Sequence, residues 1–509
     1  MRLISLPLLL AVFSVVTWAS AEEIRVKATV SSTVLADAVA VAEAGDTVIL
    51  EAGIYREAVK LSKAIILRGE PGAILEGSDP LKADWQPVAG MNDVFSVELK
   101  KQPEGLLAAG AFIAEIRWDR AQKAGEWHWQ TLLEKGTPLS GFKQVQALWM
   151  YHPQEKRAYL RWKEGASPAQ AELAVVRSNK PLIEIGASGV VVEGLTFQGG
   201  KTAIELGKGA KDCVVRKCRV DSYEDTGILI TDGASQCTVE NCALTRGALE
   251  DWRATNEIRR ENYEIWRLHK DVGKYDRVGI DLIEPGVANR ILNNRFDRVF
   301  DGICLGDYRA ESLDKPLPDA ESGRGTEIAY NVIENTRDSG IELGTGCIEV
   351  NVHHNTLRHT HGGFRFKVPR IGPVFVHHNH LIEGTPFNLW FSMDSSPAEG
   401  YIYHNTFEGG DDAAIVYSSF NAMRNFATPK WHVLNNLALN VRDGFFEQRK
   451  GTPPRDFTES NNLITKDASA AEDKGLDLST YRNGKPLPGC EKGYYHGRAP
   501  DVGAAEKGR

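Results

Sequence analysis

The chain has 509 residues and a formal net charge of −8. This mild acidity argues against a general nucleic-acid binder, which would carry a basic stripe. The chain has seven cysteines, and neither their spacing nor a histidine pair fits a zinc knuckle.

Residues 1–21 predict a secretory signal peptide. Arg2 gives a positive start, residues 3–16 are apolar, and Ala19-Ser20-Ala21 is a small-residue cleavage site. The apolar run is short for a membrane anchor, and no later stretch is long enough to span a bilayer. We therefore expect a secreted or periplasmic monomer with no membrane span.

Residues 22–84 predict the first coils of a β-solenoid. The phrases GDTVILEAGIYREAVKL and AIILRGEPGAILEGSD alternate apolar and polar residues between glycine turns. The alternation stops over 85–178, where six tryptophans accompany strand-like pieces such as ALWMYH. We interpret this segment as a small inserted β subdomain whose tryptophans pack in its core, a sugar-binding platform being the alternative.

A short phrase then recurs about every 24 residues, which is typical of a stacked solenoid. Its repeating slot holds Gly194, Cys218, Cys242, Asn294, Asn331, Asn355, Asn379, Asn405 and Asn436. Asparagine tolerates the left-handed backbone of a tight corner, and its amide can bond to the same residue in the next coil. The main helix is predicted over 179–449, with a cap and a mobile tail over 450–509.

Two further columns follow from the same repeat. Cys213 aligns with Cys237, and Cys218 aligns with Cys242, which predicts small buried residues on neighbouring coils rather than disulfides. Histidines precede the asparagine slot at positions 354, 378 and 404, which predicts a stack in a turn.

A second strand follows the slot by about eight residues. Alternation places the residue between its two inward apolar residues on the outside. Coil by coil, that outward position holds Leu229, Asp281, Cys304, Glu342, Arg365, Trp390 and Val416. Two insertions, over 249–275 and 309–323, border the coils that carry these charges.

The outward stripe suggests hydrolysis by paired carboxylates. Asp281 and Glu342 lie two coils apart, roughly 9–10 Å, near the upper end of the spacing in inverting glycosidases. Arg365 should keep Glu342 ionised and favour it as a base or metal ligand. Asp307, in the turn of the intervening coil, could shorten the gap. Aromatic faces for a sugar ring are offered by Trp390 and, in the first insertion, Trp266. A purely structural ladder of ion pairs is the alternative.

Arg365 and Lys367 also suggest β-elimination. A lyase neutralises a uronate carboxylate and stabilises an enolate-like intermediate, and basic side chains can do both. Glu342, Asp307 and Glu284 could hold Ca²⁺, although this ion takes six or more oxygens, so no cofactor is certain. His359 and His361 precede Arg365 in a turn, where either could transfer a proton or contact substrate.

The opening phrase resembles right-handed parallel β-helix proteins of the carbohydrate-active kind. The resemblance rests on Gly45-Asp46-Thr47-Val48, Gly53-Ile54-Tyr55 and Leu67-Arg68-Gly69-Glu70-Pro71-Gly72-Ala73. It implies an all-β, right-handed solenoid that cleaves glycosidic bonds of a polysaccharide or oligosaccharide. Such proteins include hydrolases with two carboxylates on nearby coils. They also include lyases of the chondroitinase B and alginate lyase group, with basic residues beside acidic calcium ligands. We expect hydrolysis slightly ahead of elimination, with a non-catalytic glycan-binding protein as a third alternative.

Overall fold

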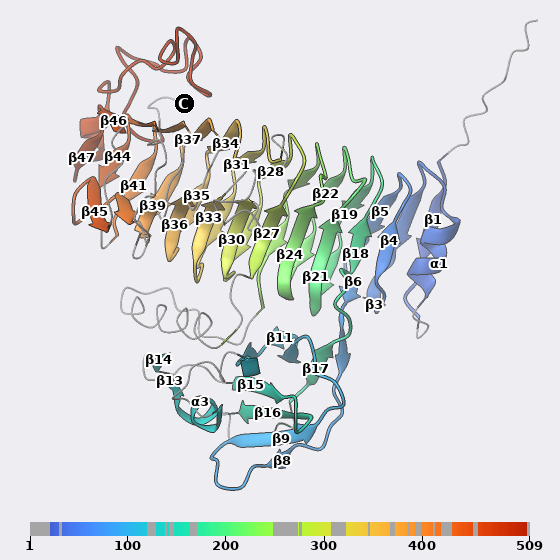
Figure 1. Ribbon diagram of the computed structural model, residues 1–509. Helices are drawn as coiled ribbons and strands as arrows, with labels where there is room; N and C mark the ends of the chain where they lie inside the picture. Colours follow the sequence, from blue (N-terminus) through green and yellow to red (C-terminus); the bar gives the residue numbers. More distant parts are fainter. Residues whose placement is uncertain are drawn as a thin grey trace, which may run out of the picture.

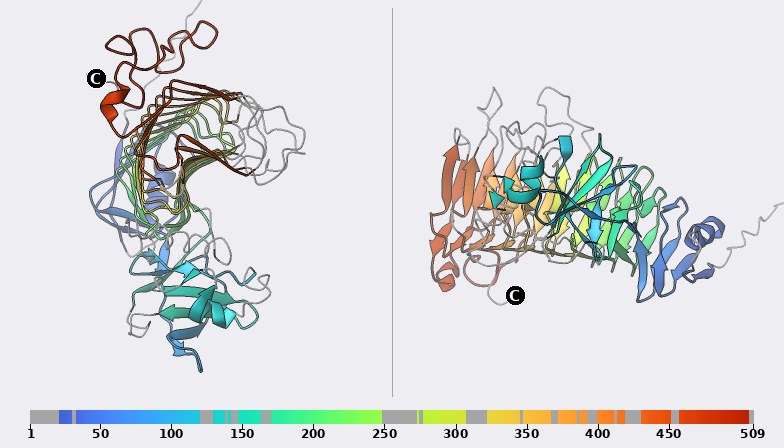
Figure 2. Two further views of the ribbon diagram at one scale, coloured as in Figure 1. Left: turned by 90° about the vertical axis from the view of Figure 1, so that its left-hand side faces the viewer. Right: turned by 90° about the horizontal axis from the view of Figure 1, so that it is seen from below.

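Three parallel sheets wrap around one continuous core and form a right-handed β-helix. The computed structural model describes residues 21–29, 33–119, 129–137, 140–141, 147–162, 168, 171–247, 273, 277–306, 322–344, 347–366, 372–384, 387–391, 399–410, 413–418, 430–450 and 457–505. Figure 1 shows the coils side by side along the helix axis, and Figure 2 shows them superimposed when viewed along that axis. The predicted signal peptide lies almost wholly outside the described residues.

Each complete coil contributes one strand to each sheet, and the coils at the two ends are incomplete. Sheet A contains β1 (Glu23–Val26), β2 (Thr47–Leu50), β5 (Ile66–Gly69), β19 (Val191–Glu193), β22 (Val214–Arg216), β25 (Thr238–Glu240), β28 (Arg290–Leu292), β31 (Glu327–Ala329), β34 (Val350–His353), β37 (Val374–His377), β40 (Gly400–Tyr403), β43 (Trp431–Leu434) and β46 (Phe457–Ser460). Sheet B contains β3 (Gly53–Tyr55), β6 (Ala73–Glu76), β20 (Thr196–Gln198), β23 (Arg219–Val220), β26 (Ala243–Leu244), β29 (Arg295–Asp297), β32 (Val332–Glu334), β35 (Thr356–Arg358), β38 (His380–Ile382), β41 (Thr406–Glu408), β44 (Leu437–Leu439) and β47 (Leu463–Thr465).

Sheet C carries the predicted second strands. It contains β4 (Val59–Leu61), β18 (Ile183–Ile185), β21 (Gly200–Leu206), β24 (Tyr223–Thr231), β27 (Val278–Ile283), β30 (Asp301–Gly306), β33 (Ser339–Leu343), β36 (Gly362–Phe366), β39 (Phe387–Phe391), β42 (Ile415–Ser418) and β45 (Phe446–Lys450). One column of buried isoleucines runs through its inner face, at positions 204, 228, 280, 303 and 341. Branched side chains stacked in register fill the core and fix which residues face out.

Asparagine amides link successive coils, as predicted. The Asn355 side chain accepts hydrogen bonds from Asn331 N at 3.0 Å and Asn331 Nδ2 at 2.9 Å. It donates to Asn379 Oδ1 at 3.0 Å and to Ile328 O at 2.9 Å. The same pattern continues to Asn462, one coil beyond the last predicted member. Because buried polar groups are costly unless hydrogen-bonded, the ladder satisfies amides that the corner would otherwise leave unpaired.

Two details of the predicted slot are wrong. The register pairs Leu195, and not Gly194, with Cys218, because Thr196 pairs with Arg219. The left-handed backbone also belongs to the residue before the ladder position. That column holds Gly194, Lys217, Asn241, Asn293, Tyr330, His354, His378, His404, Asn435 and Asn461, whose φ lies between 51° and 74°. The ladder asparagine is therefore selected by its amide contacts, while the corner conformation is adopted by its neighbour.

The insert is a separate β-rich layer beside the helix (Figure 2). It contains β7 (Ser78–Pro80), β8 (Gln86–Pro87), β9 (Val94–Glu98), β10 (Leu106–Ala108), β11 (Ala111–Phe112), β12 (Ala114–Glu115), α3 (Trp129–Lys135), β13 (Gly136–Thr137), β14 (Ser140–Gly141), β15 (Ala147–His152), β16 (Arg157–Trp162) and β17 (Leu173–Val176). Trp85, Trp149 and Trp162 are buried in its core, which agrees with a packing role for these tryptophans.

The chain ends pack against the helix. Helix α1 (Val34–Val41) covers the first coil. At the other end β46 and β47 continue the coils past the boundary predicted at residue 449. A 3₁₀ turn (Ala468–Ala471) follows, and the remaining segment packs on sheet A instead of forming a mobile tail. There Tyr403 Oη donates to Pro488 O at 2.7 Å.

All seven cysteines are buried and none forms a disulfide. Val214 pairs with Thr238 and Arg219 with Ala243, so the two predicted cysteine columns are confirmed. No helix in the described part of the chain is long and apolar enough to cross a membrane.

Replacing a central ladder residue should destabilise the helix. Asn379→Ala removes the acceptor for Asn355 N and the donor to Val352 O, so we expect the free energy of unfolding to fall by about 2–4 kcal/mol. Urea unfolding followed by tryptophan fluorescence measures this change. Asn462→Ala, at the half-buried end of the ladder, is the matched control and should cost about 1 kcal/mol or less. Equal effects at the two positions would contradict a stabilising role for the ladder.

Candidate active site

The predicted outward stripe is formed in register. Asp281 pairs with Cys304, Cys304 with Glu342, and Glu342 with Arg365. Arg365 in turn pairs with Trp390. Five successive coils therefore place these side chains in one column on sheet C.

The first three residues of the stripe are buried, contrary to the prediction, whereas Arg365 and Trp390 are half-buried. Asp281 is 6% exposed, Glu342 5% and Cys304 2%. Alternation correctly separates the two faces of a strand, but it does not show what covers the outer face. Buried carboxylates are rare unless they are paired or have a functional role, so the burial strengthens the case for a site.

A cavity of about 280 Å³ lies over this stripe. Four consecutive strands each contribute a carboxylate to its lining, namely Asp225 from β24, Asp281 from β27, Asp301 from β30 and Glu342 from β33. The remaining lining is small or apolar and includes Thr226 and Leu229. Because the coils stack, acidic side chains spread over the 118 residues from Asp225 to Glu342 line one cavity.

Sequence reasoning missed three aspartates at the start of sheet C strands. Asp225, Asp301 and Asp338 each stand one or two residues before a glycine, in DTG, DG and DSG. This recurring acid-before-glycine pattern was the available signal. Alternation could not place them, because the backbone is irregular where each strand begins.

The glycines of this pattern have no room for a side chain. A Cβ on Gly227 would lie 2.5 Å from Gly279 O, and one on Gly302 would lie 2.3 Å from Gly340 O. Only glycine lets adjacent coils approach this closely. The glycine column therefore fixes the backbone that carries the three missed aspartates.

Arg365 lies between two carboxylates and an aromatic ring. Its Nη1 is 3.3 Å from Glu342 Oε2 and 3.8 Å from Asp338 Oδ1. Its guanidinium carbon is 4.5 Å from the Trp390 ring centroid, a cation–π geometry. The two carboxylates and the ring together hold the Arg365 guanidinium in place.

Ser339 connects two of the cavity carboxylates. Its backbone N–H donates to Asp301 Oδ1 at 2.9 Å, and its hydroxyl donates to Glu342 Oε2 at 3.3 Å. Ser339 and Arg365 therefore both contact the same oxygen, Glu342 Oε2. Such fixed contacts hold a carboxylate in one orientation, as acid–base chemistry requires.

The acidic column extends toward the N-terminal coils. Glu184 pairs with Glu205, and Glu205 pairs with Leu229 next to Asp281. Burial, followed by the nearby Glu184 carboxylate, raises the pKa of Glu205. The Lys60 ammonium lies 2.6 Å from Glu184 and ends the column with a positive charge.

A buried ionic network lies next to the cavity. Glu224 Oε1 is 3.0 Å from Arg277 Nη2, and Glu224 Oε2 is 3.4 Å from Arg246 Nη2. All three side chains are at most 2% exposed. The insert contacts this network, since Phe112 lies under the Arg246 guanidinium at 5.2 Å and its N–H donates to Gly247 O. The network therefore joins the insert to the coils that carry the acids.

The other predicted residues are less closely connected to the cavity. Glu284 lies in the turn after β27 and does not line the cavity. His359 is bound by Glu383, with 2.9 Å between Nε2 and Oε2. His361 is half-buried just before β36. Asp307, Lys367 and Trp266 lie outside the described residues, so their predicted roles stay predictions. Within the described ranges, no three His, Cys, Asp or Glu side chains are arranged to hold a metal ion.

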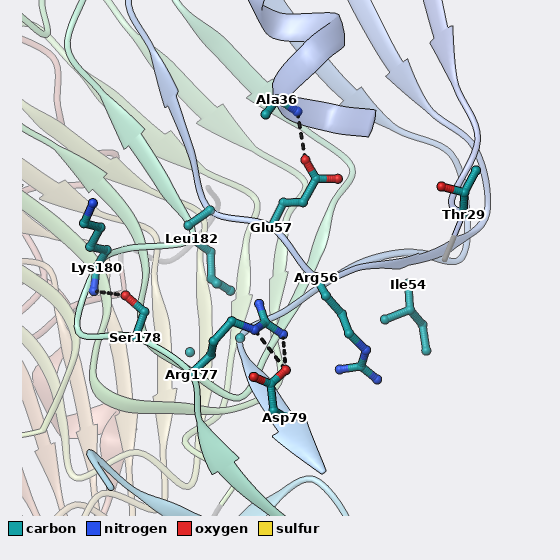
Figure 3. A pocket seen from close by; sticks show the side chains of 13 residues that line it. Thr29, Ala36, Ile54, Arg56, Glu57, Asp79, Arg177, Ser178, Lys180 and Leu182 are labelled. Carbon is teal, nitrogen blue, oxygen red and sulfur yellow. Dashed lines mark hydrogen bonds and ion pairs between the residues drawn. The ribbon is translucent and has the colours of Figure 1, made fainter. Parts of the chain in front are cut away.

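A larger cavity of about 550 Å³ lies where the insert leaves the first coils (Figure 3). Its charged groups are used to join segments of the chain. Arg177 Nε donates to Asp79 Oδ1 at 2.9 Å, and Glu57 accepts from the N–H groups of Leu35 and Ala36 at the start of α1. We interpret this cavity as a structural junction, because the buried carboxylates gather at the smaller one.

Comparisons with known proteins support the fold. Residues 183–366 match the family described as the right handed beta helix region. A solved structure described as a glycoside hydrolase has a TM-score of 0.51 and 12% identity, and the match covers 91% of this chain and 100% of that chain. The complex of XylC with xylose has a TM-score of 0.47 and 14% identity, with 90% of both chains covered. A polygalacturonase from Erwinia carotovora ssp. carotovora has a TM-score of 0.42 and 10% identity, with 91% of this chain and 99% of that chain covered. No curated protein sequence matches the chain.

Removing the carboxylate of the buried network should destabilise the protein. Glu224→Ala takes the negative charge from between two buried guanidinium groups, so we expect the free energy of unfolding to fall by about 3–5 kcal/mol. The control is Glu184→Ala, which breaks an exposed pair with Lys60 and should cost at most about 1 kcal/mol. Urea unfolding of both variants measures the difference. A loss at Glu224 no larger than at Glu184 would rule out the anchoring role.

Proposed function

We propose that this right-handed β-helix protein is a secreted carbohydrate-active enzyme that hydrolyses glycosidic bonds. The observation that carries the proposal is the cavity into which four consecutive coils each place a carboxylate. Hydrolysis of a glycosidic bond needs one carboxyl group to protonate the leaving oxygen and a second to activate water. The buried acids of sheet C supply both kinds of group on a rigid frame.

We assign the base role to Glu342 and the acid role to Asp281. Arg365 and Ser339 contact Glu342, and these contacts hold its carboxylate in the fixed orientation that a base activating water needs. Asp281 lies two coils away, roughly 9–10 Å. A gap of this size leaves room for a water molecule and supports an inverting mechanism. Trp390, beyond Arg365, would offer its face to a sugar ring.

The charge of the cavity favours a neutral glycan. A β-eliminating lyase must neutralise the carboxylate of a uronate, and it needs a cation for that purpose. Arg365 is engaged by Asp338 and Glu342, and the described lining of the cavity contains four acids and no basic residue. A uronate would meet negative charge there, so hydrolysis of a neutral substrate is the better-supported reaction. Elimination by Arg365 and Lys367 is the second candidate, because the half-buried Arg365 lies beside the acids.

Substituting either proposed catalytic carboxylate should abolish most of the activity. With a substrate found in a panel of neutral and acidic polysaccharides, we expect Asp281→Asn and Glu342→Gln each to lower kcat by about 10²–10⁴-fold, because proton transfer is lost. The release of reducing ends measures the rate. Asp297→Asn, at a surface ion pair with Arg298, is the control and should retain activity. The proposed roles fail if both site variants cleave as fast as the unmodified protein.

The chemistry of the product should separate hydrolysis from elimination. We expect new reducing ends without the ultraviolet absorbance of an unsaturated uronate, and the first product should have the inverted anomeric configuration by proton NMR. Ultraviolet-absorbing products that disappear in Arg365→Ala and Lys367→Ala would instead identify a lyase. Retarded migration in a glycan-containing gel without any cleavage would identify a binding protein.

A further inference from the structure

Two columns of aromatic rings run along one end of sheet A. In the inner column His353, His377 and Tyr403 stack with centroids 5.0 and 4.8 Å apart. In the outer column His354, His378 and His404 stack at 5.1 Å each, which confirms the predicted turn stack. Five imidazoles are thus held close together by the coil repeat.

Hydrogen-bond partners fix the protonation of these rings. His377 Nε2 lies 2.9 Å from Asn351 Oδ1 and must donate to it, so a neutral His377 accepts at Nδ1. His378 Nδ1 lies 2.7 Å from His377 Nδ1 and is therefore the donor. The same reasoning makes His353 the acceptor and His354 the donor, because His353 Nε2 donates to Glu327. These tautomers leave both rings of each pair neutral and place one hydrogen in every contact.

The C-terminal segment, residues 473–505, lies over these columns. Its Leu476 exchanges two hydrogen bonds with the Asn435 side chain, both at 2.8 Å. The second hydrogen of the Asn435 amide points to His404 Nε2 at 3.1 Å. Gly489 lies against the His377 ring. Asn435 therefore connects the segment to His404.

A proton on these histidines would reverse the contacts. A protonated His404 carries a hydrogen on Nε2, which would face the Asn435 amide hydrogen, donor against donor. A protonated His377 would carry a hydrogen on Nδ1, so His378 would have to change tautomer and accept the hydrogen bond that it now donates. Adjacent imidazolium rings about 5 Å apart would also repel each other. The Asn435–His404 contact, which links the segment to the columns, requires a neutral His404.

The surroundings disfavour the charged form. Burial, aided by neighbouring histidines, lowers the pKa of His354 to about 4 and that of His377 well below its usual value. Burial also lowers the pKa of His404 to about 4, although the backbone carbonyls of Asp501 and Gly503 act in the opposite direction. Burial lowers the pKa of His353, with Glu327 opposing.

The other titratable groups that face the columns come from every neighbouring element. Glu327 is on β31 and is held by Arg290. Tyr330 stacks on His354, Tyr403 extends the inner column, and Tyr494 of the segment contacts His404 edge-on. Asp501 adds a carboxylate near His404. The two nearby carboxylates cannot neutralise five protonated rings.

We propose that the double column of histidines is an acid-sensitive latch, which holds residues 473–505 on sheet A at neutral pH and releases them on acidification. Because the pKa values are lowered in the closed state, the open state binds more protons. The latch is therefore at full strength above pH 6.5 and weakens as pH falls toward 4. Each proton taken up on opening raises the open population about tenfold per pH unit in this window.

Cys490 provides a probe of release. Cys490 belongs to the segment and is fully buried in a cluster with Tyr403 of sheet A. Four other cysteines are buried inside the helix, namely Cys213, Cys218, Cys237 and Cys242. The full-length protein is treated with a pyridyl disulfide, which stays reactive toward thiols in acid, and labelled cysteines are identified by peptide mass analysis. We expect labelling of Cys490 to be at least about tenfold faster at pH 5 than at pH 7. The four helix cysteines should stay protected at both values.

The chain itself suggests the matched variants. The left-handed position of His354, His378 and His404 is occupied by Asn435 and Asn461 in later coils, so asparagine fits there without titrating. We expect His354→Asn/His378→Asn/His404→Asn to keep Cys490 protected in acid. The single variant His378→Asn, which perturbs the fold least, should shift the onset of labelling to lower pH. His380→Gln, at a surface pair with Glu408, should behave like the unmodified protein.

Several outcomes would overturn the latch. In the unmodified protein these are a protected Cys490 at pH 5, or simultaneous labelling of all five thiols, which would indicate global unfolding. In the variants, the contradicting outcome is that Cys490 of the triple or the single variant is labelled with the same pH profile as in the unmodified protein. If the triple variant is unfolded at pH 7, the single variant decides.

Discussion

The stacking of coils at about 4.8 Å is the constraint on which the rest of the structure depends. Backbone hydrogen bonds impose the spacing, and the asparagine amides repeat it inside the corner. Every column of the molecule inherits this distance, including the isoleucine core, the glycine row, the acidic stripe and the histidine rings. The repeat therefore turns positions far apart in sequence into neighbours at a fixed separation.

The sequence pattern predicts the columns because a period is a local property of the chain. It aligned Asp281, Cys304 and Glu342 as the structure does. It misplaced Gly194 because glycine and the ladder residues both mark a corner, and the interval to Cys218 changes only from 24 to 23 residues when Leu195 takes its place. It missed the burial of the stripe and the aspartates at the strand starts. The burial of the stripe depends on what packs over sheet C. The position of the aspartates depends on the irregular backbone at Gly302 and its equivalents, where adjacent coils approach closely.

The acidic cavity departs from what stability alone would select. Burying several carboxylates close together is unfavourable through both desolvation and mutual repulsion. The helix core, by contrast, is almost wholly apolar, and the asparagine amides buried at its corner are hydrogen-bonded. Such local conflict in an otherwise consistent structure is what a functional site is expected to show. Arg365 and Ser339 contact Glu342, and Arg365 packs on Trp390, so the unfavourable burial of charge involves only a few side chains.

In the proposed hydrolysis, the number of coils between Asp281 and Glu342 determines the stereochemistry of the product. The β30 coil separates the two acids and leaves space for a water molecule between them. A solenoid can gain or lose a whole coil without altering its core, because each coil packs only on its neighbours. Loss of the β30 coil would bring the two carboxylates to about one coil spacing, roughly 5 Å, the separation of retaining enzymes. In this architecture the number of coils between the two acids would set their separation, and with it whether the anomeric configuration is inverted or retained.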